Sequence, residues 1–224
     1  MSMAESQALH LPLAARGLSL LGVIPLDGGA AAEWEAADPR LGARLVPYED
    51  VAALVCPAPP AGADADPLHV TARHWEVHRA LLRGDVVPAP AGVVFRLDEE
   101  IVGFLTEAYA SLRAALARVR GRWEFRLHVD RVDPVFAAPK ALDLATHIYA
   151  ELRRISSGAL TYAHAAEEGR ILSAAFLVDR PASDAFRARV DALMRLNPAL
   201  ELELTGPWPP YDFVSMHSPA RPAE

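Results

Sequence analysis

Residues 121–129 have the sequence GRWEFRLHV, and this stretch decides the interpretation of the second half of the chain. Large apolar side chains alternate there with charged or polar ones from Trp123 to Val129. Such period-two alternation is typical of a β-strand with one face in a core and the other in solvent. We therefore expect a strand over about 122–130, directly after Gly121.

The segments after this strand follow a regular order. Apolar residues at helical spacing predict helices over 141–155 and 183–196. Alternating or continuous apolar runs predict further strands near 159–166, 170–178 and 199–205. Strand, helix, strand, strand, helix and strand make up the ferredoxin-like βαββαβ plan. Two helices would then cover one face of a four-stranded antiparallel sheet.

The residues before Gly121 also mix helix and strand patterns, although their order is less regular. Apolar runs predict strands over 18–26 and 41–46, and residues 48–55 are expected to form a short helix or a helical turn leading into a strand. The stretch PAPPAGADADP at 57–67 contains four prolines and predicts a mobile loop.

Two helices and two strand pieces complete this half. Residues 70–83 have a partly apolar face and precede Gly84, which predicts a helix ending there. Prolines divide 86–95 into two short strand pieces. The clearest helix begins at Asp98-Glu99-Glu100, where acidic side chains suit the positive end of the helix dipole and Asp98 is the expected N-cap.

These elements predict an α+β protein with two small domains. Residues 1–120 are expected to form an N-terminal α+β domain that ends in a long helix. Residues 121–216 are expected to form the ferredoxin-like C-terminal domain with a Pro/aromatic C-terminal segment, and 217–224 a disordered tail.

Composition excludes several classes of protein. The 224 residues carry a net charge of −7, which argues against nucleic acid and anionic membranes as partners. No apolar run approaches the roughly 20 residues of a membrane span. Cys56 is the one cysteine, so no internal disulfide can form, and its apolar surroundings predict a core residue. A cytoplasmic protein is expected.

No catalytic, cofactor or metal site is predicted. His74 and His78 have the helical spacing of two metal ligands, but Trp75 occupies the position where a metalloprotease has glutamate, and Glu76 points elsewhere. No third ligand and no phosphate-binding glycine loop is evident. Four further polar residues near the end of the 122–130 strand are expected to be solvated: His128, Asp130, Asp133 and Lys140.

The segment GPWPPYDFV at 206–214 is unusual because three prolines hold three aromatic residues on a stiff backbone. It would either fold back as a clamp on its own domain or present a preorganised surface to a partner. We expect Trp208 to act mainly as a buried clamp. Tyr211 and Phe213 are expected nearer the surface, where all three form the candidate partner-binding site.

At this segment the chain resembles the gas vesicle protein F/L family (GvpF/GvpL). The resemblance covers roughly residues 18–214, and its most specific part is GPWPPYDFV. Weaker matches occur in the family's order: LLGVIPLDGG at 20–29, VVPAPAGVVFRLDEEIVGFL at 86–105, GRWEFRLHV at 121–129, AAFLVDR at 174–180 and FRARVDAL at 186–193. Two departures are Asp212, where serine or asparagine is usual, and Ala89-Pro90-Ala91, which replaces Leu-Arg-Phe.

The resemblance implies a non-enzymatic accessory protein for gas vesicle assembly. Its implied partners are the very hydrophobic shell subunit, GvpA, and other gas vesicle accessory proteins, and it has the character of a minor vesicle component. Two alternatives remain open on the residues alone. One is a regulatory ferredoxin-like domain that binds a small molecule, and the other is an enzyme with a site around His74, Glu76 and His78.

Overall fold

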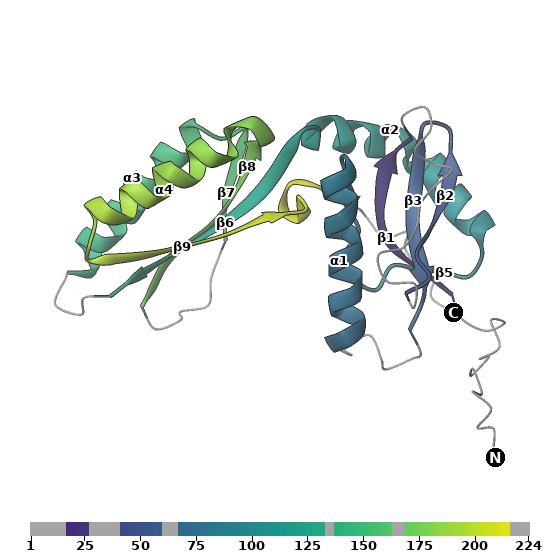
Figure 1. Cartoon of the computed structure of the whole chain (residues 1–224), viewed down its shortest axis with the longest axis horizontal. Helices are drawn as coiled ribbons and strands as arrows, with labels where there is room; N and C mark the ends of the chain where they lie inside the picture. The colour runs from purple at the N-terminus through teal and green to yellow at the C-terminus, as the bar shows by residue number, and fades with distance from the viewer. Residues whose placement is uncertain (1–16, 27–40, 60–66, 133–136, 163–168, 216–224) are drawn as a thin grey trace, which may run out of the picture.

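The protein contains two antiparallel β-sheets that lie side by side along its long axis (Figure 1). The computed structural model describes residues 17–26, 41–59, 67–132, 137–162 and 169–215. The strands of the first sheet all precede Gly121, and those of the second sheet all follow it. The predicted mixed class of helices and antiparallel sheets is confirmed.

The first sheet has the strand order β2-β3-β1-β4, with β5 also paired to β1. Its pairings are all antiparallel. The two strand pieces predicted within 86–95 are β4 and β5. The strands are β1 (Leu18–Pro25), β2 (Arg44–Tyr48), β3 (Val51–Pro57), β4 (Val87–Pro88) and β5 (Val94–Phe95).

Strand β3 is buried on both faces because helices α1 (Pro67–Arg83) and α2 (Asp98–Val119) cover opposite sides of the sheet. Val51, Ala53 and Val55 belong to the core under α2, whereas the alternate residues belong to the core under α1. A continuous apolar run suits such a doubly covered strand. The expected short helix over 48–55 is therefore wrong, and so is a helical turn. The strand that such a turn was expected to lead into is present, because Tyr48 ends β2, residues 49–50 form the hairpin turn and β3 begins at Val51.

Helix α2 begins at Asp98, as expected, but the capping role of Asp98 is wrong. Leu97 occupies the N-cap position and makes no side-chain cap hydrogen bond. Asp98 instead accepts two hydrogen bonds from the guanidinium of Arg44 on β2, one of them 2.9 Å long. These hydrogen bonds lower the pKa of the Asp98 carboxyl and tie the helix start to the edge of the sheet.

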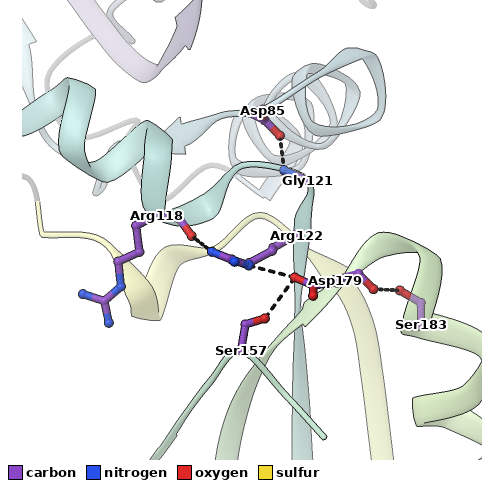
Figure 2. A network of polar contacts seen from close by, with 7 residues as sticks. All are labelled: Asp85, Arg118, Gly121, Arg122, Ser157, Asp179 and Ser183. Atoms are coloured by element: carbon purple, nitrogen blue, oxygen red, sulfur yellow. Dashed lines mark hydrogen bonds and ion pairs between the residues drawn. The ribbon is translucent and has the colours of Figure 1, made fainter.

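Gly121 joins α2 to β6 (Arg122–Arg131) with a positive φ of 66°. A polar network surrounds this joint (Figure 2). The Gly121 N–H donates to Asp85 at 2.8 Å. Asp179 accepts hydrogen bonds from Arg122 Nε at 2.8 Å and from the Ser157 hydroxyl at 2.9 Å. The first and second sheets are thus connected by side-chain contacts as well as by the chain itself.

Arg180 strengthens this joint from the second sheet. Its Nη2 donates to the carbonyl oxygens of Leu81 at 3.2 Å and Gly84 at 2.5 Å, and it pairs with Asp85 at 3.2 Å. The guanidinium also lies 5.7 Å from the centre of the Trp123 ring, within cation–π range. One arginine therefore satisfies the Leu81 carbonyl oxygen in the last turn of α1 and the Gly84 carbonyl oxygen just after it.

Replacing Arg180 by alanine should lower the free energy of unfolding by about 1–3 kcal/mol, because half-buried acceptors lose their donor. Urea denaturation measures this directly. Arg195→Ala, at an exposed position on α4, is the control and should stay within about 0.5 kcal/mol of the parent protein. Equal effects of the two changes would show that the Arg180 contacts add no stability.

The second sheet has the strand order β7-β8-β6-β9, again all antiparallel. Its elements follow the predicted order of strand, helix, strand, strand, helix and strand. Of the strand predicted over 159–166, the described part is β7, which ends at Thr161, and residues 163–166 lie outside the described residues. The elements after β6 are α3 (Ala138–Arg154), β7 (Gly158–Thr161), β8 (Arg170–Asp179), α4 (Ser183–Leu196) and β9 (Leu200–Trp208).

Helices α3 and α4 lie on the same face of the second sheet (Figure 1). Phe125, Phe176 and Phe186 pack in the core that these helices cover. The Phe186 ring centre lies 5.7 Å from that of Phe125 and 5.4 Å from that of Phe176. The predicted alternation along β6 is confirmed for its apolar face, because Phe125, Leu127 and Val129 all belong to this core. Glu124, which the pattern places on the solvent face, is instead fully buried. The opposite face of this sheet is not covered by α3 or α4, and another segment of the chain covers part of it.

Three expectations concern residues outside the described ones: most of the loop at 57–67, Asp133, and the tail at 217–224. Pro57 ends β3 and Pro67 begins α1. Within the described part of the chain, no helix combines the length and apolarity needed to cross a membrane.

Candidate functional site

The Pro/aromatic segment runs from the end of β9 towards α1 and the first sheet (Figure 1). Pro207 and Trp208 still belong to β9, which is an edge strand and therefore tolerates proline. The chain then turns through a short 3₁₀ helix, η4 (Tyr211–Phe213). The segment is thus extended at its start, as expected, and helical at its end.

The burial of the aromatic residues is the reverse of the expected one. Trp208 is 40% exposed, and its Nε1 donates to the Thr205 hydroxyl at 3.0 Å. Phe213 is only 5% exposed and Tyr211 is half-buried. The clamp role expected for Trp208 is wrong, because the turn at η4 directs the later aromatic residues inward.

The segment contacts both sheets. Phe213 packs against Ala175 and Leu177, on the face of β8 that α3 and α4 leave uncovered. Tyr211 packs against the apolar cluster between α1 and the first sheet, and Val214 packs against the cluster under α2. Residues 211–214 therefore bridge the two halves of the molecule.

A polar cluster lies under this bridge. Glu124 on β6 is fully buried and pairs with Arg126 at 2.7 Å. The Asp212 N–H donates to Glu124 Oε2 at 3.0 Å, and the Asp212 carboxylate pairs with Arg126 at 3.0 Å and accepts a hydrogen bond from the Tyr162 hydroxyl. We call Glu124, Arg126, Tyr162 and Asp212 the latch cluster.

The latch cluster shifts the pKa values of its members. Burial, followed by a side-chain hydrogen bond with the Asp212 carboxyl, raises the pKa of Glu124 to about 8, although the hydrogen bond from the Asp212 N–H acts in the opposite direction. Burial also raises the pKa of Tyr162. For Asp212 burial acts in the same upward direction, but hydrogen bonds from Glu124 and Tyr162 together with the Arg126 charge lower its pKa. A proton in this cluster therefore resides on Glu124.

The sequence did not reveal this cluster. Glu124 and Arg126 alternate with core residues, so the pattern places them on a solvent face, and nothing near them announces a covering segment. Of the four residues, only Asp212 lies in a segment that the sequence singles out, the Pro/aromatic segment. The missing information is which surface the segment covers.

The other singled-out residues form no site. His74 is exposed, His78 is half-buried and stacks edge-on against Trp75, and Glu76 is buried. Among the residues that the structure describes, no three His, Cys, Asp or Glu side chains gather as metal ligands would. His128 contacts the Ser173 hydroxyl at 2.9 Å, facing away from the α3–α4 core.

Asp130 and Cys56 also have structural surroundings. Asp130 accepts hydrogen bonds from Nε and Nη2 of Arg170 at 2.9 and 3.0 Å, so the expectation of a merely solvated carboxylate is wrong. This ion pair joins β6 to β8. Cys56 is fully buried, as expected, and burial raises the pKa of its thiol to about 11. A thiol of this kind is a poor nucleophile at neutral pH.

A cavity of about 300 Å³ lies between β1, β3 and α2. Its polar groups are Asp50, Arg113 and Arg120, and Asp50 already pairs with Arg113 and accepts a hydrogen bond from Tyr109 at 2.7 Å. The size is at the lower end for a ligand site. Nothing in this pairing favours a small-molecule ligand.

A second group of exposed apolar side chains lies on α1. Leu68, Trp75 and Leu82 are 81%, 65% and 59% exposed and recur every seven residues. Residues at this spacing lie along one side of a helix. This stripe is the main alternative to Trp208 as an apolar contact surface.

A family model described as "Gas vesicle synthesis protein GvpL/GvpF" matches residues 20–141 and 136–215. Gas vesicle protein F2 of Halobacterium salinarum is 30% identical over 155 residues, which cover 67% of this chain and 70% of that protein. Gas vesicle protein F1 of the same organism is 29% identical over 132 residues, covering 59% and 61%.

Solved structures share the fold. The crystal structure of the gas vesicle protein GvpF from Anabaena sp. PCC7120 superposes with a TM-score of 0.74 at 16% identity, covering 92% of this chain and all of that one. The GvpF structure from Microcystis aeruginosa gives 0.73 at 14% identity, covering 90% and 100%.

Proposed function

This chain belongs to the GvpL/GvpF family of gas vesicle synthesis proteins, and we propose that it supports gas vesicle assembly by binding the shell subunit GvpA and other accessory proteins. Membership supports a gas vesicle accessory role, and the family is not a known enzyme family. We place this activity in the cytoplasm, at the growing vesicle, with the protein as a minor component of it.

The observation that carries the binding proposal is the exposure of Trp208. A tryptophan that is 40% exposed at the end of a proline-stiffened edge strand loses little conformational freedom on binding. Tyr211 and Phe213, half-buried and buried, would fix the segment while Trp208 makes the contact. We therefore expect Trp208 to contact the partner, and Tyr211 and Phe213 to hold the segment in place.

The physical task would be to cover apolar surface. A very hydrophobic shell subunit exposes apolar strands and edges before it is incorporated, and such surfaces aggregate. An acidic protein with a net charge of −7 would keep a complex with this subunit soluble. Binding therefore needs an aromatic anchor on an otherwise charged surface, as Trp208 provides.

Trp208→Ala should weaken capture of the shell subunit at least tenfold, because truncating an aromatic anchor typically costs about 2 kcal/mol or more. The measurement is a titration of the purified chain against tagged GvpA. Trp75→Ala is the matched control, since Trp75 is also an exposed tryptophan but lies on α1. It should bind like the parent protein.

Each other result has a definite meaning. Loss of binding with Trp75→Ala alone would move the contact surface to the α1 stripe. Equal weakening by both changes would indicate nonspecific apolar adhesion. Unchanged binding with both would contradict the assignment of either tryptophan as an anchor.

A further inference from the structure

The charges of the latch cluster do not balance unless it holds a proton. It contains two carboxyl groups, those of Glu124 and Asp212, and one guanidinium, that of Arg126. Glu124 is fully buried and Arg126 is about one-third exposed. With both carboxyls ionised the cluster would carry a net charge of −1 in a site of low dielectric, which is unfavourable.

We propose that residues 209–215 form a proton-dependent latch, which stays docked while the Glu124–Asp212 pair shares one proton and loosens when that proton is lost. The latch joins the two halves of the molecule, since Tyr211 and Val214 pack on the first half and Phe213 on the second. Its release therefore removes contacts between the sheets. This inference does not depend on the proposed partner.

Asp212 is the member of the latch cluster that lies on the latch. Glu124 and Arg126 lie on β6, which pairs with β8 on one side and β9 on the other. Asp212 lies on the three-residue helix η4, which belongs to neither sheet. Repulsion between the two carboxylates is therefore relieved by undocking Asp212, and this withdraws its N–H from Glu124.

The sign of the pH dependence follows from Glu124. In the docked state burial, then the side-chain hydrogen bond with the Asp212 carboxyl, raises the pKa of Glu124 from 4.5 to about 8. Between these values the docked state binds one proton more than a solvated Glu124 would, so docking weakens as pH rises from about 4.5 to 8. Asp212 has a lowered pKa and stays ionised throughout this window.

The groups that act on the pair include Arg126 on β6, Tyr162, which follows β7, and Tyr211 on η4. Arg73 on α1 acts on Tyr211 through its charge. The tyrosines keep their protons in this window because burial raises both pKa values. The arginines remain charged. Among these groups, Glu124 is therefore the one whose protonation changes in the window.

Amide hydrogen exchange of the full-length protein tests the latch at pH 5.5 and 8.5, with rates corrected for intrinsic exchange. Protection of residues 211–215 should fall at least tenfold at the higher pH, because a pKa difference of one unit already corresponds to a factor of ten. Protection of β8 should stay constant. Constant protection of 211–215 would overturn the proposal.

Substitutions distinguish the effect of the proton on Glu124 from a general loss of folding. Glu124→Gln keeps an acceptor for the Asp212 N–H, mimics the protonated side chain, and should leave 211–215 equally protected at both pH values. Asp212→Asn should do the same, since one carboxylate then balances Arg126. Glu151→Gln breaks an exposed pair with Arg189 and should keep the parent's pH dependence. A parent-like pH dependence in both Glu124→Gln and Asp212→Asn would contradict the latch.

Discussion

Phe213→Ala should lower the free energy of unfolding by about 3–5 kcal/mol, as truncating a buried phenylalanine usually does. Phe213 is 5% exposed and fills the contact with Ala175 and Leu177, so its loss leaves a cavity between η4 and β8. For a chain of this size the midpoint of thermal unfolding should fall by roughly 6–20 °C.

Trp208→Ala is the comparison for this effect. Trp208 is 40% exposed and belongs to none of the buried clusters, so its truncation should cost only about 1 kcal/mol. Thermal melts of both variants at pH 6 decide the order. A larger loss for Trp208→Ala than for Phe213→Ala would mean that the aromatic residues are packed as the sequence predicted.

Gly206→Ala should destabilise the protein by about 2–4 kcal/mol, from backbone strain and overpacking together. Gly206 has a φ of 124°, which side chains with a Cβ rarely adopt. A Cβ there would lie 2.8 Å from the Glu124 carbonyl oxygen and 3.0 Å from Phe125 Cδ1. Because the first of these atoms belongs to the backbone of an inner strand, it cannot move aside.

Gly103→Ala is the matched control for the glycine change. Gly103 lies within α2, and a Cβ there would meet no atom within 4 Å. Alanine in a helix is favoured over glycine by about 0.5–1 kcal/mol, so this variant should gain stability. Urea denaturation should therefore separate the two variants in opposite directions; losses of equal size would contradict the close approach at Gly206.

Most of the secondary structure could be predicted because burial is one-sided. The apolar stripe of α2 reports a single buried face, and the alternation along β6 reports the face that packs under α3 and α4. The sequence failed at β3, where both faces are buried and periodicity vanishes. It also missed the capping of α2, since the partner of Asp98 is Arg44, 54 residues earlier.

The candidate site was located but its packing was not foreseen. The prolines indicated a stiff backbone around Trp208, which the edge position of β9 accommodates. The prolines did not indicate which way the chain turns after Pro210. The turn at η4 buries Phe213. The sequence does not single out Glu124, because its burial depends on the latch that covers it in the folded protein. The division into two domains stays a prediction.

The large sequence separation between the latch and the strands that it contacts has a consequence for folding during synthesis. The hydrogen bond between Asp212 and Glu124 spans 88 residues, and contacts of such separation carry a loop-closure cost and form slowly. β6 and β8 leave the ribosome before residues 211–214, so until then Ala175 and Leu177 have no Phe213 against them. A nascent chain paused at this point would expose an apolar patch to its neighbours on a polysome, where aggregation begins.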